Sequence, residues 1–288
     1  MNQPLLPDDI SEYYNAGREE SRLERPAGVL ERLRTQELIL RSVPQLPATI
    51  IDVGGGTGPY AFWLAELGYT VHLVDAMPLH IEQARERAKG LRSGPTSIEL
   101  GDARRLVFAD HSAEVVLLLG PLYHLTERGE RLATWREAWR VAKPGGLILA
   151  AAISRYASLL DGLSHSFLDD PVFEQIVRQD LASGQHRNPL KRSPFFTTAY
   201  FHTVEELREE ALEAGWQEVE VLAVEGPAWL TPASLDRLQQ PGPLQGRYLA
   251  MIRLVEHDPA LLAVSSHLLV IAHKAGEPSP NAAGGEGS

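Results

Sequence analysis

One short stretch of the chain limits its possible folds more than any other: residues 52–58, with the sequence DVGGGTG. It overlaps the apolar run 49–53, which predicts a buried strand, and it precedes segment 59–68, whose apolar residues recur at helical spacing. Glycine permits a tight turn and lets a ligand approach the backbone without a Cβ in the way. The free amides at the start of the following helix attract an anion. We therefore expect a ligand-binding turn between a strand and a helix.

The strand–helix alternation continues along the chain. Further strands are predicted at 70–75, 97–100, 113–119, 147–153, 218–224 and 267–272, with helices at 9–42, 80–91, 127–141 and 203–215. Apolar strands that alternate with helices predict a mostly parallel sheet covered on both faces. We therefore expect a Rossmann-like, doubly wound α/β sheet of seven strands.

This pattern divides the chain into five regions. They are an N-terminal helical lid (1–47), a Rossmann-like core (48–153), an inserted cap over the active site (154–201), the C-terminal part of the core (202–275) and a disordered tail (276–288). The tail is rich in Gly, Pro, Ser and Asn, a composition that cannot bury enough apolar surface to fold.

Two ligands fit the glycine turn: a dinucleotide, through its pyrophosphate, and S-adenosylmethionine (SAM), through its carboxylate. Residues 56–61 match the dinucleotide pattern G-x-G-x-x-G/A. The acidic Asp52, two positions before the first glycine, instead gives the D-x-G-x-G-x-G pattern of class I methyltransferases. Asp75 ends the second strand, where a carboxylate can accept hydrogen bonds from both ribose hydroxyls; it supports an adenosine ligand of either kind.

Taken in order, the stretches DVGGGTG, VD, GDA, LGPLYHL and KPGG make the chain resemble the class I SAM-dependent methyltransferases. More narrowly, it is similar to a bacterial group with the stretches GPLYHL, ISRYASLLDG and FFTTAYFH, over about residues 9–273. The resemblance implies SAM as the cofactor, with Asp102 at the adenine amino group, and leaves the acceptor open.

The expected cofactor contacts lie in the glycine turn, at the strand ends and on the N-terminal helices. They are Asp52, Gly54, Gly55, Gly56, Gly58, Asp75, Ala76, Asp102, Ala103, Leu119 and Gly120, together with Tyr14 and Arg22. An aromatic face on the N-terminal helix can stabilise the sulfonium through its ring quadrupole. The alternative is that this helix only packs against the core.

The fourth strand ends in LGPLYH, which departs from the [DNS]-P-P-[YFW] motif of adenine and amide N-methyltransferases. The mechanism that this motif serves is therefore in doubt here. Tyr123 or His124 can still take a proton from an acceptor hydroxyl or amine. The alternative is that Tyr123 packs on the cofactor and His124 caps a turn.

Four further residues are candidate acceptor contacts: Arg155, His165, Tyr200 and His202. Arg155 follows the fifth strand directly and suits an anionic acceptor; the alternative for all four is a structural role. No metal site is predicted, because the chain has no cysteine and its ten histidines include no H-x-x-x-H pair.

Charge and hydropathy narrow the class of partner. The net charge of −11 argues against nucleic acid, with a basic stretch at 186–192 as the local exception. No apolar run reaches the roughly 18 residues of a membrane span, and the N-terminus lacks the order of a secretory signal, so a cytoplasmic location is expected.

We therefore predict a SAM-dependent methyltransferase with a small-molecule acceptor. The alternatives are a peptide, protein or RNA methyltransferase, a non-catalytic SAM-binding protein and an NAD-dependent oxidoreductase. The acceptor atom, the need for a general base, the pathway and the oligomeric state stay open.

Overall fold

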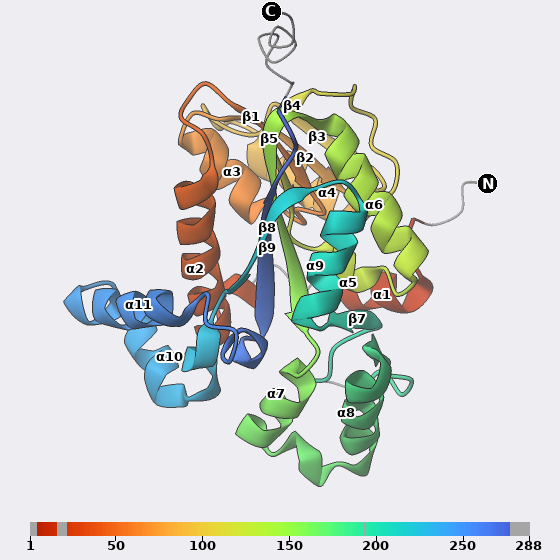
Figure 1. Cartoon of the computed structure of the whole chain (residues 1–288), viewed down its shortest axis with the longest axis vertical. Helices are drawn as coiled ribbons and strands as arrows, with labels where there is room; N and C mark the ends of the chain where they lie inside the picture. Colours follow the sequence, from red (N-terminus) through yellow and green to blue (C-terminus); the bar gives the residue numbers. More distant parts are fainter. Residues whose placement is uncertain (1–4, 16–21, 193, 277–288) are drawn as a thin grey trace, which may run out of the picture.

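The computed structural model describes residues 5–15, 22–192 and 194–276 (Figure 1). Nine strands are found in this part of the chain: β1 (Thr49–Val53), β2 (Thr70–Asp75), β3 (Ser97–Leu100), β4 (Ala113–Leu118), β5 (Ala142–Ser154), β6 (Gln185–His186), β7 (Ala199–His202), β8 (Gln217–Ala223) and β9 (His267–His273). Strands β3, β2, β1, β4 and β5 are adjacent in that order and parallel. Strand β9 pairs antiparallel with β5, and β8 pairs with β9.

Strand β1 lies in the middle of the sheet and pairs with β2 on one side and β4 on the other. The strand order therefore reverses between β1 and β4. In doubly wound sheets, ligands bind beyond the carboxyl ends of the strands at this switch point. The glycine turn directly follows β1, so the topology places it at that point.

Helices cover both faces of the sheet, as Figure 1 shows. One face carries α2 (Pro26–Ser42), α3 (Pro59–Glu66) and α4 (Pro78–Ala88), and the other carries α6 (Arg128–Val141) and α9 (Val204–Glu213). Helix α9 begins with a capping box, in which the side chains of Thr203 and Glu206 each accept a hydrogen bond from the other's backbone amide. These features confirm the Rossmann-like α/β class.

The sheet has more strands than the seven we predicted. The additional strands β6 and β7 come from the region assigned to a cap: β7 pairs with the end of β5, with Ile153 opposite Phe201, and β6 pairs with β7. The side chain of Phe201 is buried where β7 pairs with β5. Burial of this apolar side chain favours the addition of β7 to the sheet.

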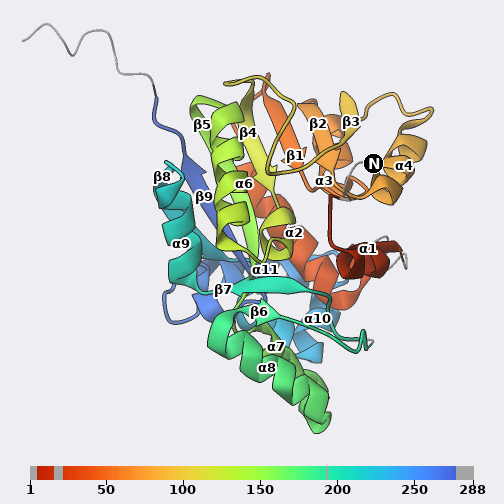
Figure 2. The ribbon, with the colours of Figure 1, turned by 90° about the vertical axis from the view of Figure 1, so that its right-hand side faces the viewer.

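Two groups of helices extend beyond the carboxyl ends of the parallel strands (Figures 1 and 2). The first comprises α7 (Ala157–His165) and α8 (Pro171–Ser183), next to β6 and β7. The second comprises α10 (Pro232–Leu238) and α11 (Pro243–Val255), inserted between β8 and β9. We had assigned residues 202–275 wholly to the core, so this second insertion was not anticipated. It packs on α2 through Leu30, Trp229, Leu238 and Ile252.

The segment predicted as an N-terminal lid has two parts. Helix α2 packs Leu38 and Ile39 into the core beneath the sheet, whereas the short α1 (Asp8–Asn15) lies at the carboxyl end of the strands. The expected disordered tail, apart from Gly276, falls outside the described residues. None of the helices in the described part of the chain has the length and apolar character that a bilayer span requires.

Candidate active site

The glycine turn has a backbone that other residues rarely adopt. Its φ angles are +69° at Gly54, +60° at Gly56 and +81° at Gly58. A Cβ added to Gly54 would lie 2.5 Å from the ring of Pro121. At Gly56 the nearest atom to such a Cβ would be His80 Nδ1, 3.9 Å away, so this position faces open space. The turn therefore presents bare backbone to a ligand.

Asp75, at the end of β2, is held against this turn by three nitrogen atoms. The amide of Gly56 donates to Oδ2 at 2.8 Å, and the amide of Met77 donates to Oδ1 at 2.8 Å. Nδ1 of His80 lies 3.1 Å from Oδ1. These contacts fix the carboxylate at the carboxyl edge of the sheet and leave part of its acceptor capacity for a ligand.

Asp52 is also buried, but neither of its carboxyl oxygens has a hydrogen-bond partner among the described residues. Burial, followed by the nearby charge of Asp75, raises the pKa of Asp52 to about 7. A buried carboxyl group without a partner is costly, and a bound cation can compensate for it. Asp52 therefore fits the ammonium group of an amino-acid moiety such as that of SAM.

Asp102 follows β3. Its carboxylate accepts hydrogen bonds from three nitrogen atoms of Arg104: the backbone amide, at 2.8 Å, Nε and Nη2. Burial acts to raise the pKa of Asp102, but the bonds from Arg104 outweigh it and hold the pKa below its usual value. The guanidinium of Arg104 also pairs with Glu130 on α6. This carboxylate is thus anionic and fixed in position.

These groups line one cavity together. Of the predicted cofactor contacts, it is bordered by Tyr14, Arg22, Asp52, Gly54, Gly55, Gly56, Asp75, Ala76, Asp102, Ala103, Leu119 and Gly120. Gly58 is the exception: it begins α3, and a Cβ there would lie 2.9 Å from Phe62, so its role is local packing. Met77 and His80 also line the cavity and were missed, although their place just after Asp75 was a usable signal.

Tyr123 and His124 lie on the one-turn helix α5 (Pro121–His124) and both line this cavity. Nε2 of His124 is hydrogen-bonded to the hydroxyl of Tyr14 from α1. Burial lowers the pKa of His124 to about 4, so its imidazole is neutral near pH 7. The Tyr123 ring packs edge-on against His124, with 4.7 Å between centroids. The structure therefore brings both predicted catalytic candidates to the cofactor cavity.

A second cavity of about 550 Å³ adjoins the first. Three residues, Tyr14, Arg22 and Tyr123, line both cavities. Much of its remaining wall is aromatic: Tyr13, Phe173, Phe195, Phe196, Phe201 and Trp229. We call the place where the two cavities meet, at Tyr14, Arg22 and Tyr123, the junction. A side chain at the junction can contact molecules in both cavities.

Two of the predicted acceptor contacts are used inside the protein instead. Arg155 is buried; its Nε donates to the carbonyl of Phe201 at 2.8 Å and its Nη2 to Glu206 at 2.5 Å. The ring of Tyr200 lies under the guanidinium of Arg131, 3.7 Å from Cζ to the ring centre. Neither residue lines the two cavities, which corrects the expected acceptor contact.

His202 and His165 have different positions. His202 is fully buried, lies 3.4 Å from Glu210 through Nε2 and lines neither cavity, so its expected contact with the acceptor is also corrected. His165 does line the second cavity, where Nδ1 is 2.9 Å from Asp161. It alone of the four candidates stays a predicted acceptor contact.

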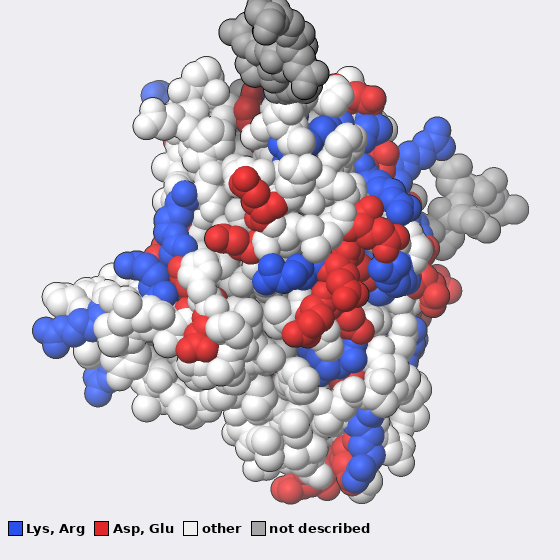
Figure 3. Space-filling view, viewed as in Figure 1, with Lys and Arg blue, Asp and Glu red and all other residues white. Residues whose placement is uncertain are grey.

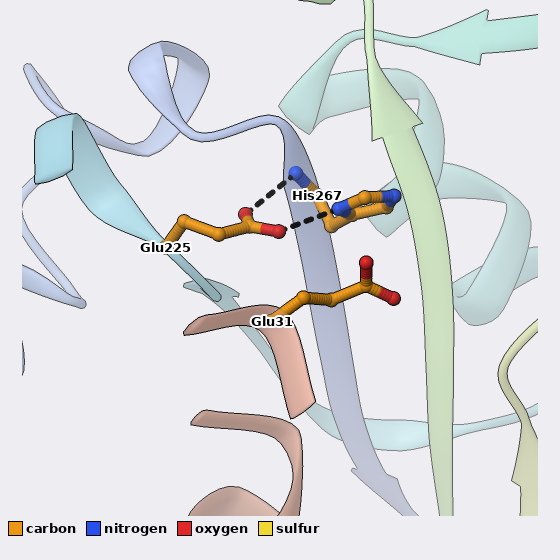
Figure 4. A group of neighbouring side chains, drawn as sticks. All are labelled: Glu31, Glu225 and His267. Carbon is orange, nitrogen blue, oxygen red and sulfur yellow. Dashed lines mark hydrogen bonds and ion pairs between the residues drawn. The ribbon is translucent and has the colours of Figure 1, made fainter. Parts of the chain in front are cut away.

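Glu31, Glu225 and His267 form a cluster that the sequence did not predict (Figure 4). Nδ1 of His267 bonds Glu225 at 2.6 Å, and Glu31 is paired with Arg22. Burial acts to lower the pKa of His267, but the two glutamates outweigh it and raise it to about 9. The protonated imidazole then pairs with the glutamates, and the cluster forms a network of ion pairs with Arg22.

The basic stretch 186–192 does not form an anion site. Lys191 pairs with Glu12 and Arg192 pairs with Asp170, Arg187 donates to the neutral oxygens of His186 and Gln185, and His186 is buried. Figure 3 shows acidic side chains gathered over α9 on the face in view, where Glu205, Glu209 and Glu213 are exposed. Neither surface is suited to a phosphate backbone.

Comparison with known proteins points to one family. Residues 50–146 match a family model described as a methyltransferase domain. Methyltransferase GfsG of Streptomyces halstedii is 31% identical over 152 residues, which cover 52% of this chain and 52% of that protein. Demethylmenaquinone methyltransferase of Deinococcus radiodurans is 33% identical over 118 residues, covering 40% of this chain and 47% of that protein. The chain thus spans about half the length of these curated relatives.

Solved structures share the fold. A SAM-dependent methyltransferase from Thermotoga maritima, described as a possible histamine N-methyltransferase, has a TM-score of 0.55 to this chain at 18% identity. The likeness covers 92% of this chain and 98% of that one. At 18% identity, this likeness shows that the two proteins share a fold and shows nothing about the reaction.

Proposed function

We propose that the chain is a class I SAM-dependent methyltransferase, because residues 50–146 match a methyltransferase domain, and that it transfers the methyl group of SAM to a small, largely apolar acceptor. One observation carries the proposal: the cavity at the glycine turn and the aromatic cavity meet at Tyr14, Arg22 and Tyr123. A cofactor in the first cavity and an acceptor in the second are then neighbours, as direct transfer requires.

In this proposal three carboxylates hold SAM. Asp75 accepts hydrogen bonds from the ribose, Asp52 compensates the ammonium group and Asp102 holds the adenine amino group. SAM itself supplies a methyl group already activated by the sulfonium. The protein therefore mainly has to orient the acceptor, and orientation alone can supply up to about 7–11 kcal/mol of a barrier in the best intramolecular models.

Tyr123 and His124 assist deprotonation of acceptors that need it. Because the pKa of His124 is lowered to about 4, its neutral imidazole is a weak base and assists through hydrogen bonding; its Nε2 is bonded to the hydroxyl of Tyr14. Helices α7 and α8 with β6 and β7 act as the cap that keeps water from the junction. The N-terminal α1 closes the cofactor cavity through Tyr14.

The character of the second cavity supports an apolar acceptor. Its aromatic walls favour a flat or apolar molecule over a polar one. One relative is named for demethylmenaquinone, a quinone, which agrees with that preference. Lys191 and Arg192 of the basic stretch are paired with carboxylates of the chain, which disfavours an RNA acceptor.

Transfer of labelled methyl from SAM to a cell extract tests the proposal. We expect label in the small-molecule fraction after separation by size. Label confined to protein or RNA would overturn the small acceptor. Absence of label in every fraction, with S-adenosylhomocysteine still binding in a calorimeter, would overturn catalysis in favour of a non-catalytic SAM-binding protein.

A further inference from the structure

His186 is a polar group that the proposed reaction does not yet use. It lies on the short strand β6, is 1% exposed, and stacks on Phe201 with 4.7 Å between ring centres. Its Nδ1 is 2.8 Å from Oδ2 of Asp180 on α8, and Ser158 Oγ lies 3.5 Å from the same nitrogen. Asp180 is fully buried. The ring is thus fixed in position by a carboxylate and an aromatic face.

This pairing sets which nitrogen carries the hydrogen. A carboxylate only accepts hydrogen bonds, so Nδ1 of His186 donates to Asp180; in the neutral form of the ring, the lone pair is then on Nε2. Nε2 is buried and has no hydrogen-bond partner among the described residues. Leaving such a group unpaired costs stability, so its position calls for an external donor.

The surroundings of His186 restrict what that donor belongs to. His186 lines the second cavity, where Phe173, Phe196 and Trp229 are also on the wall. Apolar rings surround an unpaired acceptor nitrogen, and this combination suits an apolar ring system with one hydroxyl or amine hydrogen. The ring centre of Phe196 lies 6.2 Å from that of His186 and 6.4 Å from that of Tyr123. Phe196 therefore lies between His186 and the place where the two cavities meet.

We propose that Nε2 of His186, oriented by Asp180, accepts a hydrogen bond from a hydroxyl of an aromatic acceptor bound in the second cavity. This assignment rests on the proposed function, because it identifies that cavity as the acceptor site. It makes His186 a binding residue that selects hydroxylated over alkylated aromatic compounds. Asp180 is a positioning residue that acts through His186.

Two probes of nearly the same size test the assignment: 2-naphthol, which can donate a hydrogen bond, and 2-methylnaphthalene, which cannot. Both are titrated calorimetrically into protein saturated with S-adenosylhomocysteine. We expect 2-naphthol to bind about tenfold more tightly, the worth of one hydrogen bond to a buried, otherwise unpaired group. In His186→Leu this preference falls to about twofold or less, because the variant keeps an apolar wall without the acceptor nitrogen.

Two further variants separate this role from general damage. Asp180→Asn reduces the preference for 2-naphthol, because the ring is no longer held in one tautomer. His257→Gln changes an exposed histidine that lines neither cavity, and it leaves the preference unchanged. Equal binding of both probes to the wild type, binding of neither, or an unchanged preference in His186→Leu would each overturn the assignment.

Binding of S-adenosylhomocysteine is recorded first for every variant. If it binds normally while the naphthol preference is absent, the assignment of His186 fails and the proposed methyltransferase function stands. If the wild type does not bind it, the proposed function fails first, and the second cavity loses its identification as the acceptor site.

Discussion

At the scale of single residues, two carboxylates at adjacent strand ends have opposite surroundings. Asp75 is held by the amides of Gly56 and Met77 and by His80, whereas Asp52 has no partner among the described residues. Hydrogen bonds stabilise a charged carboxylate and burial without them destabilises it. Asp52 consequently has a pKa of about 7 and is partly protonated at neutral pH.

This predicts a pH dependence for cofactor binding. A cationic ligand favours the charged form of Asp52, so binding releases a proton below the pKa of about 7. The affinity for SAM should therefore rise with pH between about 6 and 8 and then level off. Calorimetry in buffers of different ionisation enthalpy measures both the affinity and the proton release. Asp52→Asn should remove the dependence; a flat profile in the wild type contradicts this role.

Replacing Asp75 should weaken cofactor binding directly. Asp75→Ala removes the proposed ribose acceptor and releases the amide of Gly56, so we expect at least about tenfold weaker binding of SAM. The matched control is Asp110→Ala, which removes an aspartate paired with Arg140 outside the cavity lining. Thermal melting of both variants checks that the fold survives. Unchanged affinity in Asp75→Ala sinks the ribose assignment.

The candidate site was predictable where a local motif sets the geometry. Asp52 and Asp75 directly follow apolar residues of their strands, and Asp102 lies two residues after β3, so their positions at the sheet edge follow from the strands. Arg155 and His202 were misassigned because their partners, Glu206 and Glu210, lie on a different element. Spacing alone does not reveal whether a charged side chain faces a cavity or a buried partner.

At the scale of elements, helix α1 contributes one side chain, the aromatic ring of Tyr14, to the lining of the cofactor cavity. Tyr14 bonds His124 and packs with Ile10 and Met77. A ring beside a sulfonium contributes about 0.5–2 kcal/mol, and a neutral thioether receives none of that electrostatic part. Tyr14→Ala should therefore weaken SAM more than S-adenosylhomocysteine, by about 2- to 30-fold. Tyr14→Phe keeps the ring and should preserve the difference; equal losses for both ligands in Tyr14→Ala contradict a cation–π role.

The junction of α2, β8 and β9 predicts a pH-dependent stability. The pKa of His267 is raised to about 9 by Glu225 and Glu31. A raised pKa stabilises the fold fully below the unfolded value of about 6.5. That contribution is lost as the pH rises through 9. Urea unfolding between pH 6.5 and 9.5 should show a decline in the unfolding free energy that is smaller in His267→Gln. Parallel curves for the two proteins would falsify the ion-pair assignment.

The elements themselves were predictable to different degrees. Strands β1, β2, β4, β5 and β9 were recognised by their apolar runs, and β3 and β8 by their alternation of apolar and polar residues. Strands β6 and β7 were missed, because the pairing of Phe201 with Ile153 depends on where the chain returns in space. The insertion of α10 and α11 was missed because its apolar residues pack on α2, far away in sequence.

At the scale of the whole molecule, the two cavities have different origins. The family model covers residues 50–146, which carry the glycine turn and all three carboxylates of the cofactor cavity. Only Tyr123, of the residues that line the second cavity, lies within that span. Most of the others come from the N-terminal helices and from the two helical insertions, while Ile153 lies on β5 and His267 on β9. The family therefore identifies the cofactor, and the acceptor depends on parts that the family model does not describe.

A crystal structure of the chain with S-adenosylhomocysteine tests the central claim most directly. We predict the ribose at Asp75, the adenine at Asp102 and the sulfur at the junction beside Tyr14 and Tyr123, facing the aromatic cavity. The ligand bound elsewhere, or with its sulfur turned away from that junction, would contradict the account.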